Sequence, residues 1–469
     1  MQDIYLTNSL TRKREKFSPI KDGETGVYSC GPTVYWNQHI GHMYAYVQWD
    51  VLVRFLKYAG YKVKWVMNIT DVGHMTSDED TGEDKMERGA EREGVSVWEI
   101  ADKYIKQFVE SMDLLNIQKP DVLCRATEHI AEQINLIEKI EKAGFTYKTK
   151  MGIVFDTSKF PGYTDFGRLK LEKQKAGSDV EFDADKKQPW DFLLWVTGNT
   201  KHIMQWDSPW GKGYPGWHIE CTAMSTKYLG NNFDIHTGGV EHISVHHTNE
   251  VAQGYAAFGK QTANYWLHNS WLLGKEGEKM SKSLGNYVTA QELVEKGYDP
   301  LAMRYLILTS HYKKGLNFSF EALDSAQSAL NNLRELVLAA KTQSTRVALS
   351  SEKQKKVEEF ILRFFKSLAD DLNVPKALAT LWEAVKSNIP SEDKYDLVLS
   401  FDAVLGLKLA EVKNVEIKIP VDVADLLSER AKLRKEGNFE EADRLRKEIE
   451  LKGFKIVDTP EGQRVSLEK

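Results

Sequence analysis

The chain has 469 residues, of which 42% are hydrophobic and 28% are charged. That length exceeds one compact core, so two to four domains are expected, and the composition excludes a disordered protein. The net charge of −5 neither favours nor excludes a nucleic-acid partner, because basic residues can gather on one face of an acidic protein.

The cysteines and the first residues bear on where the protein works. Cys30, Cys124 and Cys221 are too few, and odd in number, for a disulfide framework, which favours a reducing compartment. The first residues lack the apolar segment of a signal peptide, and no run of about 18 apolar residues predicts a membrane span. We therefore expect a cytoplasmic enzyme with no membrane partner.

A strand, a helix and a second strand are predicted near the start of the chain. Residues 26–31 and 63–70 read as buried strands. Between them apolar residues recur at helical spacing from Val47 to Ala59, and Gly60 is well placed to end the helix. Such a unit predicts a parallel sheet with a right-handed crossover.

The middle of the chain predicts an insertion between two halves of the sheet domain. Residues 76–94 are polar and acidic and are expected to form a loop, and we assign no function to its stretch 76–84. From 117 to 205 a helix over 128–143 precedes strand-like, turn-rich pieces. The strand signal returns at 233–239, and a helix is expected over 246–259.

The C-terminal part is predicted to be helical. Thr289 and Glu292 form a capping-box pattern for a helix that ends near Gly297. Residues 320–410 show helical periodicity almost throughout, broken by one polar linker. Two short charged helices and a hairpin are expected at the end of the chain.

The stretch HIGH, residues 39–42, lies where the first predicted strand turns into the helix, an edge at which open α/β sheets bind ligands. A helix N-terminus offers free N–H groups to a phosphate, and His39 and His42 can donate hydrogen bonds as charge builds on it. Gly41 lets the ligand approach the backbone. Taken alone, however, four letters are better explained by a chance surface turn.

The stretch KMSKS, residues 279–283, places Lys279 and Lys282 on a glycine-flanked loop. Lysine ammonium groups are good clamps for a leaving pyrophosphate. The loop by itself is also consistent with a solvated turn or a phosphorylation site. Both stretches together, in this order and flanking a parallel-sheet pattern, resemble the signature of class I aminoacyl-tRNA synthetases, which implies adenylate-forming chemistry.

A second group of residues has the chemistry of a zinc site. Cys221 ends the stretch GWHIEC, and His246 and Glu250 are spaced i and i+4, so they project from one face of the predicted helix. With Cys30 they are ligand types that suit Zn²⁺. Taken singly, each residue also fits a purely structural role, because a buried cysteine usually belongs to the core and a helical histidine usually contacts solvent or a carboxylate. His247 with Glu250 is a sterically possible alternative, and His218 lies one turn before Cys221.

The stretches CGPTVY, HIGH, GWHIEC, FDIH-x-GG…HH-x-NE and KMSKSLGN together resemble the cysteinyl-tRNA synthetase family. The stretches LADDLNVPKALATLWE and EADRLRKEIELKGFKIVDTPEG match it as well, so the resemblance runs from about residue 3 to residue 465. It implies one Zn²⁺ per chain, held by Cys30, Cys221, His246 and Glu250. Cys124 then remains a structural thiol without an assigned role.

The resemblance also implies a catalytic and a substrate set. His39, His42, Lys279 and Lys282 would be catalytic, and Thr70, Trp217 and Glu241 would contact the substrate cysteine. The family commonly has Asp at position 241, so the detailed contact there differs. The implied ATP-binding residues are His39, Gly41, His42, His236, Gly238, Gly239, Lys279, Met280, Ser281, Lys282 and Ser283.

The implied activity is the adenylation of L-cysteine with Mg²⁺-bound ATP and transfer of the cysteine to tRNA(Cys), by a monomer. The implied α/β fold has a Rossmann-like parallel-sheet domain split by an insertion, then an all-α helical bundle and a small C-terminal domain. The expected ranges are 1–116 and 206–275 for the halves of the catalytic domain, 117–205 for the insertion, 276–319 for the KMSKS loop and stem-contact region, 320–410 for the bundle on the anticodon side, and 420–469 for a tRNA-binding domain.

The charged end of the chain has two readings. Alone it would form a solvated helical hairpin. Beside the catalytic motifs a tRNA-gripping role is favoured. The candidate phosphate contacts are Lys432, Arg434, Lys435, Arg444 and Arg446.

Three other functions compete with this interpretation. A ligase that joins cysteine to an aminosugar in the mycothiol pathway shares the zinc, HIGH and KMSKS residues, but the C-terminal match favours the synthetase. A zinc hydrolase would use Glu250 or Glu220 as its base and would act without ATP. A catalytically silent tRNA-binding relative is disfavoured by the intact HIGH and KMSKS stretches.

Overall fold

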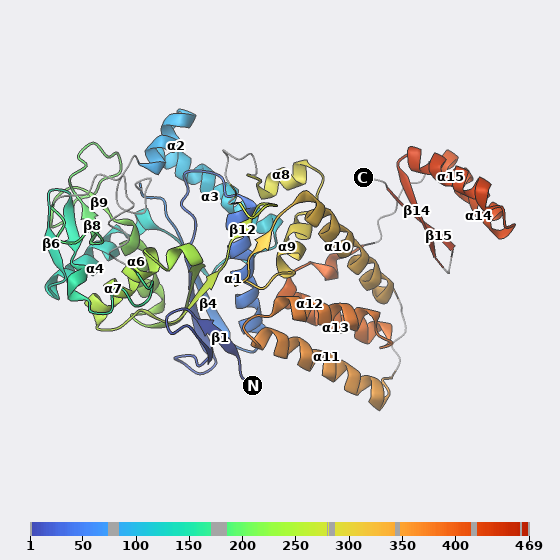
Figure 1. Cartoon of the computed structure of the whole chain (residues 1–469), viewed down its shortest axis with the longest axis horizontal. Helices are drawn as coiled ribbons and strands as arrows, with labels where there is room; N and C mark the ends of the chain where they lie inside the picture. Colours follow the sequence, from blue (N-terminus) through green and yellow to red (C-terminus); the bar gives the residue numbers. More distant parts are fainter. Residues whose placement is uncertain are drawn as a thin grey trace. The chain divides into compact units, whose positions relative to one another are not determined.

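A computed structural model of the chain describes residues 2–73, 84–169, 185–278, 280, 287–342, 348–413, 420–459 and 462–467. The chain divides into two compact units, Met1–Glu411 and Val412–Lys469. In the larger unit a parallel sheet lies between an antiparallel sheet on one side and a helical bundle on the other (Figure 1). Among the described residues, no helix is long and apolar enough to cross a membrane.

The central sheet has five parallel strands in the order β11-β10-β3-β4-β5. They are β3 (Glu24–Ser29), β4 (Lys62–Ile69), β5 (Val122–Arg125), β10 (Phe233–Gly239) and β11 (Ala263–Asn269). The chain lays down β3, β4 and β5 in one direction and then returns to add β10 on the other side of β3. This is a Rossmann-like order with its switch point between β3 and β10. The predicted α/β fold is confirmed.

Alternate residues of the strands face two different cores, as a doubly covered sheet requires. Val27 packs in the core that contains α1 (Ile40–Tyr58). Its neighbour Tyr28 packs in the core that contains residues of α6 (Trp217–Leu229) and α7 (His246–Phe258). The helix predicted after HIGH is therefore confirmed as α1.

The insertion forms a four-stranded antiparallel sheet in the order β6-β7-β8-β9. Its elements are β6 (Thr146–Lys148), β7 (Gly152–Phe155), β8 (Phe192–Val196) and β9 (Tyr214–Pro215), with α4 (Ile130–Lys142) packed near it. Strand β5 falls inside the range 117–205 but pairs with β4 of the parallel sheet. The antiparallel sheet therefore begins only at β6 and extends to β9, beyond residue 205.

The loop expected over 76–94 is wrong for its second half, which forms α2 (Lys85–Glu93); residues 74–83 lie outside the described residues. The Asp84 side chain caps α2 by accepting from the Glu87 N–H, and Gly94 ends it in the left-handed region. Met86 and Ala90 are buried, and α2 packs on α3 (Val97–Leu114). The sequence did not predict this helix because its few apolar residues stand among many charged ones.

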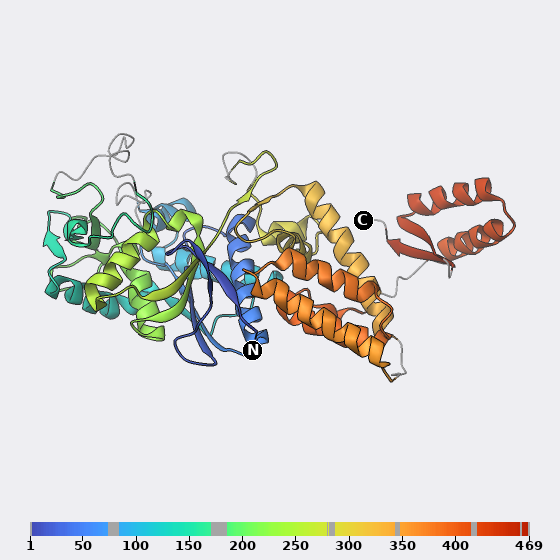
Figure 2. The ribbon, with the colours of Figure 1, turned by 60° about the horizontal axis from the view of Figure 1, so that its bottom comes forward.

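Helices make up the rest of the larger unit (Figure 2). Thr289 and Glu292 form the predicted capping box, so the helix expected there is confirmed. The helices are α8 (Ala290–Glu295), α9 (Pro300–Leu308), α10 (Phe320–Lys341), α11 (Ser351–Ala369), α12 (Val374–Lys386) and α13 (Ser391–Leu405). Short paired strands complete the unit: β1 (Tyr5–Asn8) with β2 (Lys13–Lys16), and β12 (Leu272–Leu273) with β13 (Leu316–Asn317).

A buried ion pair ties α1 to α9 and to the bundle. The Arg304 guanidinium on α9 is fully buried and donates to Asp50 Oδ2 on α1 at 2.5 Å. It also donates to the main-chain oxygens of Leu405, at the end of α13, and of Leu115, after α3. Arg54 donates to the same carboxylate oxygen at 2.7 Å. The charge of Asp50 is thus compensated inside the protein.

The smaller unit contains α14 (Val421–Lys435), α15 (Phe439–Leu451) and the hairpin of β14 (Phe454–Thr459) and β15 (Gly462–Leu467). The two charged helices and the hairpin expected here are confirmed. Their apolar residues form a small core that includes Val423, Leu427, Ile449, Phe454 and Ile456.

Candidate active site and metal centre

A cleft of about 790 Å³ lies at the carboxyl ends of β3 and β10, beside the switch point of the parallel sheet. Twelve of the predicted site residues line it: Cys30, His39, Gly41, His42, Thr70, Trp217, Cys221, Gly238, Gly239, Glu241, His246 and Met280. His236 and Glu250 do not line it. Lys279, Ser281, Lys282 and Ser283 lie outside the described residues.

The four predicted metal ligands come together at one end of this cleft. Cys30 follows β3, Cys221 lies on α6, and His246 and Glu250 are one turn apart on α7. Their ligand atoms all lie within 4.8 Å of one another. The two Sγ atoms are 4.0 Å apart, and His246 Nε2 lies 3.0 Å from Glu250 Oε1.

The surroundings of these ligands fit a bound cation. Glu250 is fully buried, and its Oε1 accepts no well-aligned hydrogen bond from the described residues, although His246 Nε2 lies 3.0 Å away. Burial raises the pKa of Glu250 and, with Cys221 beside it, that of Cys30, whereas the hydrogen bond from Cys30 lowers the pKa of Cys221 to about 7. Two thiols, an imidazole and a carboxylate in one buried place form a donor set typical of zinc.

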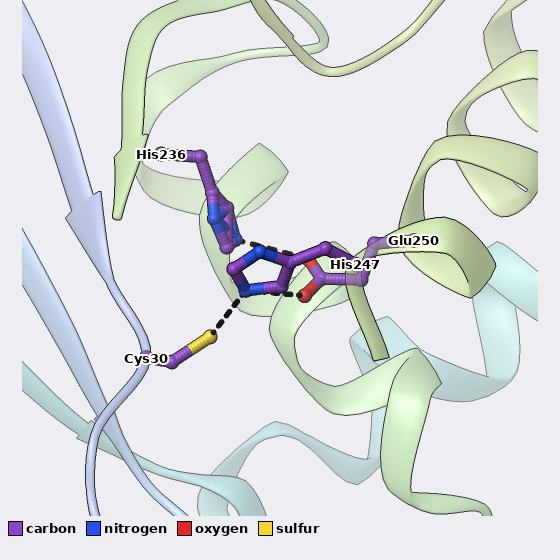
Figure 3. Close-up of side chains that lie close together, drawn as sticks. All are labelled: Cys30, His236, His247 and Glu250. Carbon is purple, nitrogen blue, oxygen red and sulfur yellow. Dashed lines mark hydrogen bonds and ion pairs between the residues drawn. The ribbon is translucent and has the colours of Figure 1, made fainter. Parts of the chain in front are cut away.

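A second group of four residues overlaps the first and could also hold a metal (Figure 3). It consists of Cys30, His236, His247 and Glu250. His247 Nε2 lies 3.2 Å from Cys30 Sγ, and His236 Nε2 lies 3.1 Å from Glu250 Oε2. The sequence interpretation assigned His236 to ATP and kept His247 only as an alternative, so it did not anticipate this group.

Access to the cleft distinguishes the two groups. Cys221 and His246 line the cleft, whereas His236 and His247 are fully buried behind it. A metal that touches a substrate must be reached from the cleft, which favours the group with Cys221 and His246. An outer histidine orients a ligand in each group: His218 Nδ1 lies 3.0 Å from Nδ1 of His246, and His268 Nε2 lies 2.7 Å from Nδ1 of His247, so it is access that separates the two groups.

HIGH lies at the N-terminus of α1, on the wall of the cleft. His39 is the N-cap residue, and its Nδ1 accepts from the Gly41 N–H at 2.9 Å. The rings of His39 and His42 are 3.9 Å apart. A β-carbon at Gly41 would lie 2.5 Å from the His39 ring, so only glycine permits this packing.

Residues that flank the KMSKS loop contact HIGH directly. The Ile40 N–H donates to the Val288 oxygen at 2.8 Å, and the Tyr287 ring meets the His39 ring edge-on at 5.0 Å. Met280 is nearly buried and lines the same cleft. The chain that follows the loop is thus anchored beside α1.

Both HIGH histidines are held neutral at pH 7. Burial lowers the pKa of His39 to about 4. His42 touches the solvent of the cleft but is surrounded by protein, and desolvation together with His39 lowers its pKa to about 3. Neutral imidazoles at a helix N-terminus can still donate hydrogen bonds to an anion.

The residues predicted for the amino acid line the cleft near the metal ligands. The Trp217 ring stacks on the His246 ring at 4.4 Å, and Thr70 donates to Glu220 Oε2 at 2.9 Å. Glu241 Oε2 accepts from Trp271 Nε1 at 2.8 Å. Trp217 therefore touches a predicted metal ligand, while one oxygen of the Glu241 carboxylate already accepts a hydrogen bond from an indole N–H.

Sequence reasoning missed several residues of the cleft. Asn68 orients Thr70 by donating to it at 3.1 Å and accepts from the Gly31 N–H at 2.8 Å. A β-carbon at Gly31 would collide with the Asn68 main-chain oxygen, so the glycine allows β3 and β4 to meet here. His242 and Arg92 also line the cleft. Of these residues, Asn68 could have been predicted from the sequence, because it lies at the carboxyl end of a predicted parallel strand.

Known proteins resemble this chain along almost its whole length. The family described as "tRNA synthetases class I (C) catalytic domain" matches residues 16–328. "Cysteine--tRNA ligase 1" of Burkholderia lata is 47% identical, covering 98% of this chain and 96% of its own. The cysteine–tRNA ligase of Treponema denticola is 43% identical, covering 97% of each. The chain belongs to the cysteine–tRNA ligase family.

A solved structure outside the cysteine–tRNA ligase family shares the fold. The methionyl-tRNA synthetase of Mycobacterium tuberculosis, in complex with methionyl-adenylate, aligns with a TM-score of 0.57 at 16% identity, covering 82% of this chain and 90% of that one. The predicted class I aminoacyl-tRNA synthetase fold and ligase class are therefore confirmed.

The basic residues predicted to contact tRNA lie in the smaller unit. Arg434, Arg444 and Arg446 each form an ion pair with a carboxylate of that unit. Lys432 and Lys435 lie in the last turn of α14. Their contact with tRNA stays a prediction.

Proposed function

We propose that the protein activates L-cysteine with ATP, releasing pyrophosphate, and transfers the cysteine to the 3′-terminal ribose of tRNA(Cys). One observation carries the proposal: three of the four zinc-type ligands, Cys30, Cys221 and His246, line the same cleft as the HIGH histidines, and the ligand atom of Glu250 lies within 4.8 Å of theirs. A group that selects a thiol and a group that binds a nucleotide phosphate would thereby face one another across a single space.

In this proposal Cys30, Cys221, His246 and Glu250 hold one Zn²⁺. Zinc bound there would supply a direct bond to the substrate sulfur, which the hydroxyl of serine cannot match at neutral pH. Discrimination by one strong bond removes the need for a hydrolytic editing site. Trp217, stacked on His246, would close one side of the amino-acid pocket, and Glu241 would accept from the substrate ammonium group.

ATP would bind at the N-terminus of α1. The neutral His39 and His42 would donate hydrogen bonds to its phosphates as the cysteine carboxylate displaces pyrophosphate, and the helix N-terminus would add positive potential. Lys279 and Lys282 are proposed to hold the departing pyrophosphate. Among the described lining residues Glu241 is the only carboxylate, so Mg²⁺ would enter with ATP rather than occupy a carboxylate cage.

The test is charging of purified tRNA with labelled cysteine and Mg²⁺-ATP at fixed salt. Acid-precipitable cysteinyl-tRNA that forms only with tRNA(Cys) is the expected result. Cysteine-dependent pyrophosphate exchange without charging would mean that the acceptor is a different molecule, such as an aminosugar. Chelator-sensitive hydrolysis without ATP would favour the hydrolase and contradict the proposal.

A further inference from the structure

One part of the cleft lining is not explained by the amino acid or by ATP. It consists of Tyr35, Trp36, Lys85 and Arg92, from the turn before α1 and from α2. Among the described lining residues, Lys85 and Arg92 are the only lysine and arginine. This part of the lining therefore offers positive charge and aromatic surface to a ligand in the cleft.

Arg92 is held in a fixed position by aromatic and polar contacts. Its guanidinium carbon lies 3.6 Å from the centroid of the Trp36 ring, which itself stacks with the Tyr104 ring. Nη2 donates to the Tyr35 oxygen at 3.2 Å and to Glu93 Oε1 at 3.0 Å. A guanidinium fixed in this way loses little entropy when it binds an anion.

Part of that guanidinium is still available for a ligand. Its hydrogen bonds and its ion pair to described residues all use Nη2, which leaves the N–H groups of Nη1 and Nε to donate to a ligand. The neighbouring Glu93 is shared with Lys103, which lowers the pKa of Glu93 to about 2. Two cations thus face one carboxylate here, and the side chain of Arg92 is 35% exposed.

We propose that Arg92, together with Lys85, binds the phosphodiester backbone at the 3′ end of the acceptor RNA. The inference rests on the proposed function, which requires the terminal ribose to reach this cleft. A 3′ end that enters this cleft must do so as a single strand, and single strands bind to arginine and aromatic side chains combined in this way. The phosphates of ATP are the competing ligand, but HIGH already serves them at the N-terminus of α1.

The experiment compares Arg92→Ala with Arg88→Ala. Arg88 lies one turn earlier on the same helix and does not line the cleft, so the control removes the same charge. We expect Arg92→Ala to lower kcat/KM for tRNA about tenfold, the loss expected for one charge-assisted hydrogen bond. The KM for ATP in cysteine-dependent pyrophosphate exchange should keep its wild-type value, and Arg92→Lys should retain part of the charging.

A binding measurement locates the contact on the RNA. Wild-type protein should bind intact tRNA more tightly than tRNA lacking its two 3′-terminal nucleotides, and Arg92→Ala should bind both forms equally. The slope of log affinity against log salt should fall by about 0.7 for intact tRNA. Unchanged affinity for intact tRNA, or a raised KM for ATP in the variant, would overturn the inference. Absence of exchange and charging in the wild type would instead count against the proposed function.

Discussion

The metal-ligand group and the smaller unit use charged and polar side chains in opposite ways. Cys30 and Cys221 are separated by 191 positions in the chain, yet their sulfur atoms meet in a buried place. In α15, Arg444 pairs with Glu441, only three positions away, and both side chains are exposed. Residues far apart in sequence meet only if the whole fold is correct, whereas neighbours on a helix meet whenever the helix forms. Effects of substitution should differ accordingly.

The largest effect is expected at the metal group. Cys221→Ser should lose bound zinc and cysteine activation together. Metal affinity and activity should each fall by more than the roughly 10- to 100-fold that follows from removing a residue that only hydrogen-bonds to a metal ligand. Metal analysis and pyrophosphate exchange measure the two losses. Cys124→Ser is the matched control, because Cys124 is equally buried but belongs to neither group of possible metal ligands and donates to the Met67 oxygen, at 3.5 Å. Full zinc occupancy in Cys221→Ser would contradict the ligand assignment.

The buried ion pair tests the same contrast without metal. Arg304→Met leaves Asp50 buried with one fewer partner, and we expect a loss of about 3–5 kcal/mol in stability, measured by thermal or chemical unfolding. The control, Arg363→Met, breaks an exposed pair with Glu383 and should change stability little. Equal effects of the two substitutions would show that burial is not what separates these pairs.

The HIGH histidine gives a smaller, pH-dependent effect. The pKa of His39 is about 4 in the folded protein against about 6.5 unfolded, so between these values the unfolded chain binds more protons. Stability is therefore lost as the pH falls through this window, by about 2 kcal/mol at pH 5 from this group. His39→Asn keeps an N-cap acceptor but cannot titrate. Unfolding curves at pH 7.5 and 5 should differ less for the variant than for the wild type.

The smallest effect on stability is expected in the smaller unit. Arg444→Ala removes an exposed pair within one helix and should leave the unfolding midpoint unchanged. If Arg444 contacts a phosphate, the salt dependence of tRNA binding should nevertheless become shallower, by roughly one phosphate contact. A clear drop in the unfolding midpoint would show that this exposed pair stabilises the fold as the buried pair does, which would contradict the comparison.

Regular periodicity and capping residues made most of the fold predictable. The parallel unit of β3, α1 and β4, the capping box at Thr289 and the terminal hairpin all follow from local patterns. The helix α2 did not, since its buried face of Met86 and Ala90 is narrow and lies among charges. The assignment of β5 to the parallel sheet also depends on pairing, which short strands do not encode.

The site was predictable only to the extent that motifs carried it. A resemblance supplied the zinc group, whose atoms the structure brings within 4.8 Å. It gave no indication of His247 beside Cys30, or of Arg92 stacked on Trp36. Both contacts join elements that are distant in sequence, so no local pattern announces them.

The pairing of Asp50 with Arg304 has a consequence for synthesis on the ribosome. The two residues are separated by 254 positions. At about 5–20 residues per second, the carboxylate emerges roughly ten to fifty seconds before its partner exists. During that interval Asp50 can pair with Arg54, which follows it by four residues, but it lacks the second cation that the finished protein places on the same oxygen. The buried packing around Asp50 is therefore completed only after α9 has been made.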